Sequence, residues 1–536
     1  LAHAGELWRT RLEELEASWT AIAGRLAELG GNGAPAALPP AALDRAVTTL
    51  ARGYDDVRGG FGRAPKFPPS MVLAFLARHT ARTGSLEAAV MLDGTLTAMD
   101  RGGIYDQLAG GFARYSVDAD WVVPHFEKML YDNAQLARVY ALRAAATGDG
   151  FAKRVALETA EFILRDLGTS EGGFAAALDA DTVVDGRSVE GATYVWTPQQ
   201  LAEVLGPQDG ALAADLLVVT ADGTFEHGTS TLQLPLDPPD PQWWRSAQQH
   251  LLAGRGDRPQ PARDDKVVTS WAGLAIAALS DVGVLFDRPG LVTAATTCAE
   301  LVLGTHVVDG RLRRASLGGV VSPAMAVLDD HGNLAEGLLA LHQATGEVRW
   351  LHEAGALIDV AVEHFRDEDG TWYDTADDAE TLLLRPRSDA DNAEPSGQSA
   401  IAGALATYAA ITGSTRHREL AAQAVAAGGS TAMRDPRFGG WTLAVAEMLA
   451  AGPVQVAVVT DHADSPAADE LALVARSALA GRGVVIQGAP DAPGVPLLAQ
   501  RPVPPHAAAA AYVCVGTTCT LPLTSPEDLR AGLTEL

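Results

Sequence analysis

The sequence predicts a mainly α-helical protein, an (α/α)6 toroid of six helical hairpins closed into a ring, with a small C-terminal α/β lobe. Helical periodicity runs from about residue 41 to 452, neighbouring helices are separated by glycine-bearing breaks, and a loop of glycine and aromatic residues recurs between them. The expected helices are 41–55, 70–84, 86–101, 124–148, 151–167, 269–286, 289–307, 325–345, 347–365, 396–412, 415–428 and 441–451.

The recurring loops favour closure of the ring. They read GGFGRAPKF (59–67), GGFARYS (110–116), EGGFAAALDAD (171–181), DGTWYD (369–374) and FGGW (438–441). Because they fall at the same point of each helical unit, a ring would gather them at one mouth. An open solenoid of stacked hairpins is the alternative.

The expected organisation has three parts. Residues 1–40 carry a helix with one narrow apolar seam and a loose linker, and residues 41–452 form the toroid. A Pro-rich stretch at 234–244 marks an insertion around 185–262. From residue 453 to 536, buried-strand patterns alternate with helices, as expected of an α/β lobe.

Composition narrows the function classes. The 536 residues include 40 Lys and Arg against 67 Asp and Glu, a net charge of −27, so we expect no nucleic-acid partner. No apolar run reaches the roughly 20 residues that span a bilayer, so no membrane partner is expected. With 3 Cys, a disulfide framework is not predicted and a cytoplasmic location is favoured.

Neither a cofactor nor a metal is predicted from motifs. The sequence has no Walker loop, nucleophile elbow or His-Glu-x-x-His motif. Cys514 and Cys519 have no second pair of Cys or His nearby, so two reduced thiols are expected there rather than a zinc site. Cys298 lies in an apolar helix and is expected in the core.

The densest polar segment is WVVPHFEKMLYDNAQL (121–136). If a helix begins at Pro124, one of its faces carries a polar stripe beside Tyr131, which on an inner helix would face a central cavity. The stripe consists of His125, Lys128, Asp132 and Gln135. We expect His125 to be the catalytic acid and base, oriented by Lys128 and Asp132. A solvated outer face is the alternative.

Carboxylates and aromatic residues recur on the mouth loops. Aromatic faces with acids are typical of sites for polyhydroxylated ligands, and two carboxylates roughly 5–9 Å apart are typical of glycoside hydrolysis. Acids that cap helices are the commoner alternative. The expected ligand-binding residues are Asp106, Tyr115, Tyr131, Asp179, Asp181, Glu190, Trp196, Asp265, Lys266, Trp271, Asp330, His331 and Glu394.

Several segments resemble the YyaL-like family that includes spermatogenesis-associated protein 20. They are GGFGRAPKFP (59–68), 102–136 with PHFEKMLYDN, LDADT with EGATYVW (178–196), DDKVVTSWAGL (264–274), LDDHGNLAEGLLALHQATG (328–346), DNAEPSGQSA (391–400) and AYVCVGTTCTLP (511–522). The resemblance implies a six-hairpin glycosidase-like toroid, similar to N-acylglucosamine 2-epimerase. It also implies a thioredoxin-like domain upstream, which is expected to be missing from this chain.

Three positions depart from the family pattern. Ala272 stands where Asn is expected in W-N-G-L, His331 where Tyr is expected after the Asp pair, and Gln398 where Asn is usual in P-S-G-N-S. Each departure changes a hydrogen-bonding group, so the ligand of this chain is expected to differ in detail. His331 is then either a gained acid/base group or a surface histidine.

We therefore expect a carbohydrate-active enzyme that works in the toroid mouth on a small sugar-like ligand. Epimerase or isomerase chemistry by histidine-assisted proton transfer is favoured over hydrolysis by paired carboxylates. The alternatives are a binding or quality-control module that holds a glycan or peptide without turnover beside a thioredoxin-like domain, and a purely structural toroid.

Overall fold

The computed structural model describes residues 35–534, apart from 451, 453, 463, 480 and 517, together with five positions near the N-terminus. Those five are Trp8, Thr10, Arg11, Glu14 and Ser18. Most of the predicted N-terminal helix and linker therefore lies outside the described residues.

The helical body is a closed ring. Each inner helix contacts the next, and the last returns to the first, which confirms the toroid and rules out the open solenoid. In ring order, the inner helices are α4 (Ser70–Thr83), α6 (Leu130–Thr147), α11 (Thr269–Leu285), α13 (Leu328–Thr345), α15 (Gly397–Thr412) and α17 (Gly440–Ala450). The outer helices are α3 (Pro40–Ala51), α5 (Leu86–Arg101), α7 (Gly150–Phe162), α12 (Pro289–His306), α14 (Val348–His364) and α16 (Thr415–Arg434).

Burial separates the two layers. Helix α15 is buried on nearly every side, as a helix with no wide polar face must be. Helix α14 buries one stripe that includes Trp350 and Ile358 and exposes the other face. All twelve predicted helices are present in the described part of the chain. The sixth hairpin joins distant parts of the sequence, because α3 packs against α17.

One predicted helix begins late. Residues 124–129 are extended, as strands β2 (Pro124–His125) and β3 (Lys128–Met129), and α6 begins at Leu130. These strands pair with β1 (Tyr115–Ser116) and β4 (Ala177–Leu178). The prediction that His125, Lys128 and Asp132 share one helix face is therefore wrong, because pairing with distant strands fixes this backbone.

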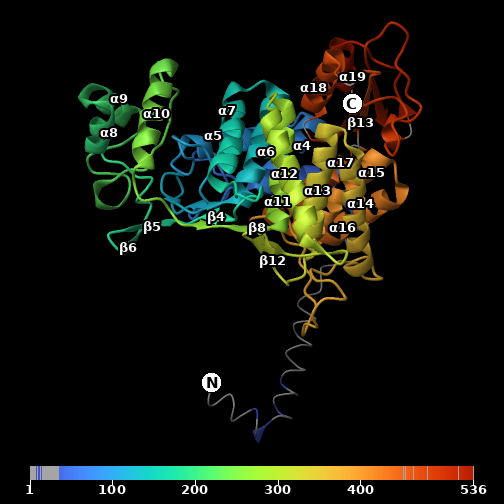
Figure 1. Ribbon diagram of the computed structural model, residues 1–536, viewed down its shortest axis with the longest axis horizontal. Coiled ribbons are helices and arrows are strands. Elements are labelled where there is room, and N and C mark those ends of the chain that lie inside the picture. Colours follow the sequence, from blue (N-terminus) through green and yellow to red (C-terminus); the bar gives the residue numbers. More distant parts are fainter. Residues whose placement is uncertain are drawn as a thin grey trace.

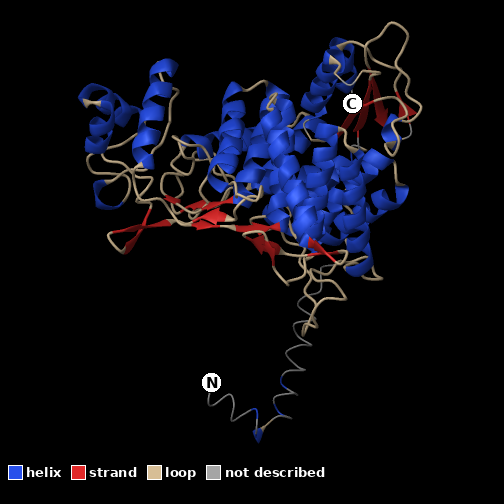
Figure 2. Cartoon of the chain, in the orientation of Figure 1, coloured by secondary structure: helices blue, strands red, loops and turns tan. Residues whose placement is uncertain are grey.

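The glycine and aromatic loops form a repeated turn after the outer helices. In four of them an antiparallel bridge closes the turn, at Tyr54–Phe61, Tyr105–Phe112, Gly168–Phe174 and Arg366–Trp372. Short strands lie along this end of the body, below the helices in Figures 1 and 2. Besides β1 to β4, these short strands are β7 (Arg263–Asp264), β8 (Lys266–Val268), β9 (Val307–Val308), β10 (Arg311–Leu312), β11 (Ala315–Leu317) and β12 (Val320–Val321).

The segment between β4 and β7 extends to one side of the ring, at the left of Figure 1. It begins with the hairpin β5 (Asp181–Val184) and β6 (Arg187–Glu190) and continues as α8 (Pro198–Leu205), α9 (Pro207–Leu216) and α10 (Pro241–Gly256). Trp196, Leu201 and Leu251 belong to its own apolar core. Its treatment as an insertion, and the three-part division of the chain, stay predictions.

The C-terminal α/β lobe lies at the other end of the ring, at the upper right of Figure 1. Its sheet has the order β14-β13-β15-β16, in which β13 and β14 are parallel and the other pairs antiparallel. The elements are β13 (Val454–Val459), α18 (Pro466–Leu479), β14 (Gly483–Gly488), β15 (Ala510–Val515), β16 (Thr518–Cys519) and α19 (Pro526–Thr534). Contacts of α18 and β14 with inner helices dock the lobe on the ring.

The cysteines differ from expectation in one respect. Cys514 and Cys519 are bonded as a disulfide, so the prediction of two reduced thiols is wrong. The register of β15 and β16 places the two residues directly opposite each other, 4.0 Å apart at Cα. Cys298 is a buried free thiol in the core, as expected. Among the described residues, no helix has the length and apolar character needed to cross a membrane.

The inner ring depends on glycine where helices touch. A Cβ built on Gly273 of α11 would lie 2.5 Å from backbone atoms of Asn333 and Leu334 on α13. Gly273→Ala is therefore expected to lower the free energy of unfolding by about 1–3 kcal/mol, although alanine has the better helix propensity. Gly304→Ala on α12 is the matched control, since nothing lies within 4 Å of its Cβ.

Urea denaturation of both variants measures the difference. The control is expected to gain up to about 1 kcal/mol. Equal stability of the two variants would contradict tight packing of α11 on α13.

Candidate functional site

His125 is held at the mouth end of the ring by aromatic stacking and a carboxylate. Its ring stacks on Tyr115 with centroids 4.9 Å apart, and Tyr115 stacks on Phe67 at 4.8 Å. Its Nδ1 lies 2.8 Å from Oε1 of Glu190, the last residue of β6. This hydrogen bond fixes the imidazole and leaves Nε2 on the other side, 3.9 Å from Glu127 Oε2.

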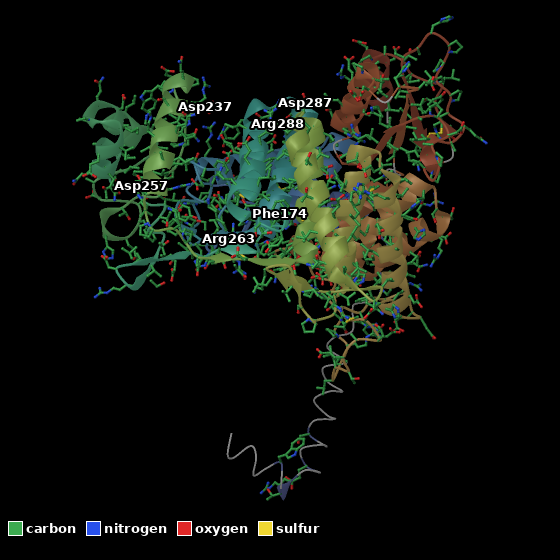
Figure 3. All side chains as sticks on the ribbon, in the orientation of Figure 1. Phe174, Asp237, Asp257, Arg263, Asp287 and Arg288 are labelled. Atoms are coloured by element: carbon green, nitrogen blue, oxygen red, sulfur yellow. A yellow bond between two sulfur atoms is a disulfide. The ribbon has the colours of Figure 1, made fainter. Side chains whose placement is uncertain are left out.

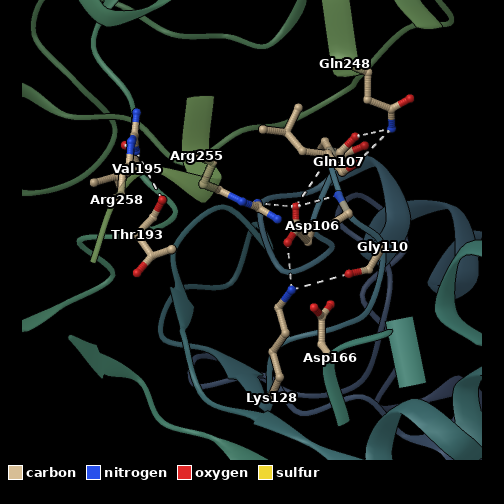
Figure 4. Close-up of polar contacts among 12 residues, drawn as sticks. Asp106, Gln107, Gly110, Lys128, Asp166, Thr193, Val195, Gln248, Arg255 and Arg258 are labelled. Atoms are coloured by element: carbon tan, nitrogen blue, oxygen red, sulfur yellow. Dashed lines mark hydrogen bonds and ion pairs between the residues drawn. The ribbon is translucent and has the colours of Figure 1, made fainter. Parts of the chain in front are cut away.

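Lys128 does not orient His125. In the extended chain it points to the opposite side, where its Nζ donates to Asp106 Oδ2 at 2.7 Å and to the Gly110 carbonyl. Arg255 of α10 donates to the other Asp106 oxygen at 2.8 Å (Figure 4). The Tyr194 ring packs against both cations.

This triad is a structural junction. Asp106, Lys128 and Arg255 are all buried, and Asp106 also accepts from the amides of Leu108 and Ala109. Burial opposes ionisation of Asp106, but Arg255 and Lys128 hold its pKa well below the usual range. These contacts occupy both oxygens of the Asp106 carboxylate, and its expected contact with a ligand hydroxyl stays a prediction.

Asp132 lies in the first turn of α6 and is buried, and its Oδ2 has no hydrogen-bond partner among the described residues. Burial raises its pKa well above the ordinary value, Arg114 opposes that rise, and Glu127 and Glu394 add to it. Arg114 donates to Glu127 at 2.9 Å. Asp132 therefore lies in the same electrostatic environment as the groups that flank His125.

Trp271, in the first turn of α11, and Glu394, in the loop before α15, join this environment. Trp271 Nε1 donates to Glu394 Oε1 at 3.0 Å, and Ser270 Oγ donates to Oε2 at 2.8 Å. Tyr131 packs edge-on against Trp271, with ring centroids 4.9 Å apart. Burial and the nearby Asp329 raise the pKa of Glu394 to about 7, although its two donors oppose the rise.

We call these residues the rim cluster. It consists of Arg114, Tyr115, His125, Glu127, Tyr131, Asp132, Glu190, Trp271 and Glu394. Apart from Glu190, which ends β6, the members precede or begin inner helices α6, α11 and α15, so they lie at one end of the ring. The labels of Arg263, before α11, and Arg288, after it, mark the two opposite ends in Figure 3. The cluster combines titratable groups with aromatic faces.

Asp330 serves the helix ends. It is fully buried, accepts from the Ser270 amide at 2.9 Å and pairs with Arg314 at 2.9 Å. Burial and Asp329 raise its pKa to about 8 despite Arg314. These bonds tie the start of α13 to the start of α11, so Asp330 positions the rim rather than offering a free acceptor.

His331 and Trp196 are packed into the interior. His331 is 1% exposed, its Nδ1 lies 3.1 Å from the Val327 carbonyl, and burial lowers its pKa to about 4. It is neither the gained acid/base group nor the surface histidine that the sequence allowed. Trp196 is 1% exposed beneath the Arg258 guanidinium, and its expected contact with a ligand stays a prediction.

Four other predicted site residues make local contacts: Asp179, Asp265 and Lys266 are exposed, and Asp181 is half-buried at the start of β5. Asp179 accepts from the Asp181 amide, and Asp181 accepts from Ser188 Oγ at 2.6 Å. Asp265 pairs with Arg263 at 2.6 Å, and Lys266 pairs with Asp264 at 3.0 Å. These local contacts account for the four side chains, although Asp181 lies opposite Glu190 in the register of β5 and β6.

Sequence reasoning missed Glu127 and Arg114 as site residues. Glu127 was placed on a helix that begins at Pro124, which hid the alternation of an extended segment, and Arg114 was placed only in the loop 110–116. In that alternation His125 and Glu127 share one side. Part of this pattern is present in the sequence, because His125 and Glu127 are polar and Phe126 between them is apolar.

One group of described side chains has the spacing of a cation site. The ligand atoms of His364, Asp377 and Asp378 lie within 4.8 Å of one another. His364 Nδ1 is 2.8 Å from Asp377, and Arg311 pairs with Asp378. The three residues lie toward solvent, and these pairs account for their arrangement without an ion.

The raised pKa of Glu394 predicts a pH dependence. An unfolded glutamate loses its proton near pH 4.3, whereas folded Glu394 holds it until about pH 7. The stabilisation that this proton gives is complete below the lower value and is lost as the pH rises to about 7. Glu394→Gln is therefore expected to lose less stability than the wild type between pH 5 and pH 8.

Urea denaturation at the two pH values gives the measurement. Glu363→Gln on the exposed face of α14 is the matched control and is expected to follow the wild type. A Glu394→Gln profile that also follows the wild type would contradict a buried, protonated Glu394.

Comparison with known proteins gives relatives along most of the chain. No protein-family model matches. Human spermatogenesis-associated protein 20 is 32% identical over 554 residues, which cover 92% of this chain and 70% of the relative. The rat protein of the same name is 34% identical over 428 residues, covering 70% of this chain and 54% of its own length.

Solved structures with a similar course of helices include two sugar enzymes. Cellobiose 2-epimerase from Spirochaeta thermophila is 17% identical, covers 74% of this chain and 97% of its own, and has a TM-score of 0.33. The GH76 α-mannanase of Bacteroides thetaiotaomicron is 10% identical, covers 76% of this chain and 94% of its own, and has a TM-score of 0.47.

Proposed function

The chain belongs to the family of spermatogenesis-associated protein 20, and we propose that its toroid is an enzyme that acts on a sugar at the rim cluster. The proposed reaction is epimerisation or isomerisation next to a sugar carbonyl. In it, one group removes a proton from the carbon beside the carbonyl and an acid protonates the intermediate.

The observation that carries this proposal is the pairing of His125 with Glu190. The carboxylate binds Nδ1 at 2.8 Å, which is the arrangement that orients an imidazole and stabilises its protonated form. Nε2 makes no hydrogen bond among the described residues and is the atom that would take the proton. Glu190 thereby replaces Lys128 and Asp132, the partners that the sequence suggested.

The carboxyls of the cluster supply the complementary acid. A pKa of about 7 for Glu394 keeps a proton available near neutral pH, and burial also raises the pKa of Asp132 well above its ordinary value. Trp271, which is partly exposed and packs edge-on against the buried Tyr131, offers an aromatic surface to the apolar side of a sugar ring. The net charge of −27 disfavours phosphorylated sugars, so neutral and amino sugars are the proposed substrates.

Glycoside hydrolysis is the second candidate. The observation in its favour is the same raised pKa of Glu394, because a glycosidase needs one carboxyl that is protonated at working pH. Asp132 or Glu127 would then act as the second carboxylate. Because hydrolysis removes no proton from carbon, it does not need His125 as a base.

One experiment separates the two reactions. The chain is incubated in D2O with a panel of neutral sugars, N-acyl amino sugars and β-linked and α-linked disaccharides, and products are followed by proton NMR. Epimerisation or isomerisation predicts deuterium at the carbon beside the carbonyl, whereas hydrolysis predicts new reducing ends without exchange. If no member of the panel shows either change, the result counts against an enzyme that acts on sugars and favours a binding role.

A further inference from the structure

A second site lies at the opposite end of the ring, beneath the C-terminal lobe. A pocket there is lined by residues from all six inner helices and is covered by α18 and β14. About 680 Å³ in and around the pocket is not filled by protein atoms, and part of this space is open solvent. The rim cluster is built at the first turns of inner helices, whereas this pocket is built on their later turns.

Three arginines and two carboxylates give the pocket its charge. Arg138 is paired, since it donates to Asp281 at 2.6 Å and to Glu336 at 3.3 Å. Glu336 also accepts from Thr407 Oγ1 at 2.9 Å. The two carboxylates of the lining are thus both bound to Arg138.

The other two arginines lack a carboxylate. Arg78 donates to the Ala444 carbonyl at 2.9 Å and Arg476 donates to the Gln343 carbonyl at 2.7 Å. No carboxylate oxygen of a described residue lies within 4.0 Å of either guanidinium. Each guanidinium has five N–H donors, so the hydrogen bond above uses one and leaves others for the pocket that both side chains line.

Burial of these charges is only partly compensated. Burial lowers the pKa of Arg78 to about 10, with Arg138 adding to the effect and Glu336 opposing it. Burial likewise lowers the pKa of Arg476 to about 10 against Asp281 and Asp469. The C-terminal end of a helix stabilises a nearby cation only weakly. An anion bound between the Arg78 and Arg476 guanidiniums would stabilise both charges far more.

We propose that this pocket binds a small organic anion through its carboxylate or phosphate group, held between Arg78 and Arg476. Beside the polar Gln343 and Thr407, the wall includes apolar side chains such as Leu142, which suits a short hydrocarbon portion of the ligand. The excess of one positive charge in the lining fits a single anion in a chain that is otherwise acidic. The site does not depend on the proposed sugar reaction.

The position of the site gives the anion a structural consequence. Arg476 belongs to α18 of the lobe, whereas Arg78 belongs to α4 of the ring. An anion that binds both residues joins the two parts of the molecule. Ligand binding is therefore expected to raise the melting temperature of the folded chain by mass action.

Isothermal titration of the chain with inorganic phosphate and with butyrate tests the proposal and distinguishes the two anionic groups. The wild type is expected to bind one of the probes saturably, one per chain. Arg476→Gln is expected to weaken this binding by about tenfold or more, because it removes a charge-assisted contact. Gln343→Glu adds a negative charge at the pocket while keeping the side-chain oxygen that accepts from the Val485 amide, and it should weaken binding similarly.

Arg530→Gln is the matched control, since Arg530 lies exposed on α19 of the same lobe. Circular dichroism melting shows which variants are folded. If Arg476→Gln does not fold, Gln343→Glu still tests the proposal. Loss of binding in the folded pocket variants with binding retained by Arg530→Gln supports the proposal. No saturable binding to the wild type, unchanged binding in a folded pocket variant, or equal loss in the control overturns it.

Discussion

His125→Gln is expected to lower the rate of proton exchange or turnover of a sugar by about 10²–10⁴-fold, the usual contribution of a general base. Glutamine keeps a polar side chain beside Tyr115 and Glu190 but cannot take up a proton near neutral pH. The rate constant in D2O measured by NMR checks the change. Because His125 is partly exposed, the free energy of unfolding should change by less than about 1 kcal/mol.

His250→Gln is the matched control, an exposed histidine of α10 with a local contact to the Ser246 carbonyl. It should keep the wild-type rate. Glu190→Gln should fall between the two, because it removes the charge that stabilises the imidazolium without removing the base. A His125→Gln variant that keeps the full rate would remove His125 from the chemistry.

Asp106→Asn is expected to destabilise the protein by about 3–5 kcal/mol, the cost of leaving buried charges without their partner. Lys128 and Arg255 would then lie within the same buried region with no carboxylate between them. Urea denaturation measures the loss. Since Arg255 comes from α10, the helices of the side segment should also detach more easily, which protection from hydrogen exchange would reveal.

Asp237→Asn provides the comparison. Asp237 pairs with Arg101 at 2.7 Å, but the carboxylate side chain is 79% exposed, so its loss is expected to change stability by less than about 1 kcal/mol. Equal effects of the two substitutions would contradict a structural role for the buried triad.

Helix periodicity and loop repetition were sufficient to predict the ring. The apolar stripes and glycine breaks located all twelve helices, because each helix must bury a face against its neighbours. The strand and helix patterns after residue 453 likewise located the lobe. These features are local in sequence, so they can be recognised without knowing which helices and strands pack together.

The parts that failed depend on distant pairing. Residues 124–129 have a polar pattern that fits a helix, but β1 and β4 pair with them and hold them extended. That pairing turned Lys128 away from His125 and toward Asp106. Nothing near Lys128 in the sequence identifies Arg255 as the third member of the triad.

The candidate site was therefore predicted in part. His125, Glu190, Trp271 and Glu394 were singled out as acids, bases or aromatic residues, and the structure brings them to one end of the ring. The pocket beneath the lobe was not predicted. Its lining comes from all six inner helices and the lobe, so no single segment of the sequence contains its pattern.

The most direct test of a sugar site at the rim cluster is the NMR signal of the His125 ring during titration with the sugar that exchanges fastest in D2O. The signal is assigned by its loss in His125→Gln. We expect it to shift saturably with sugar, while the signal of His250 stays in place. A sugar that binds and leaves the His125 signal unmoved would show that binding takes place elsewhere and would contradict the proposed site.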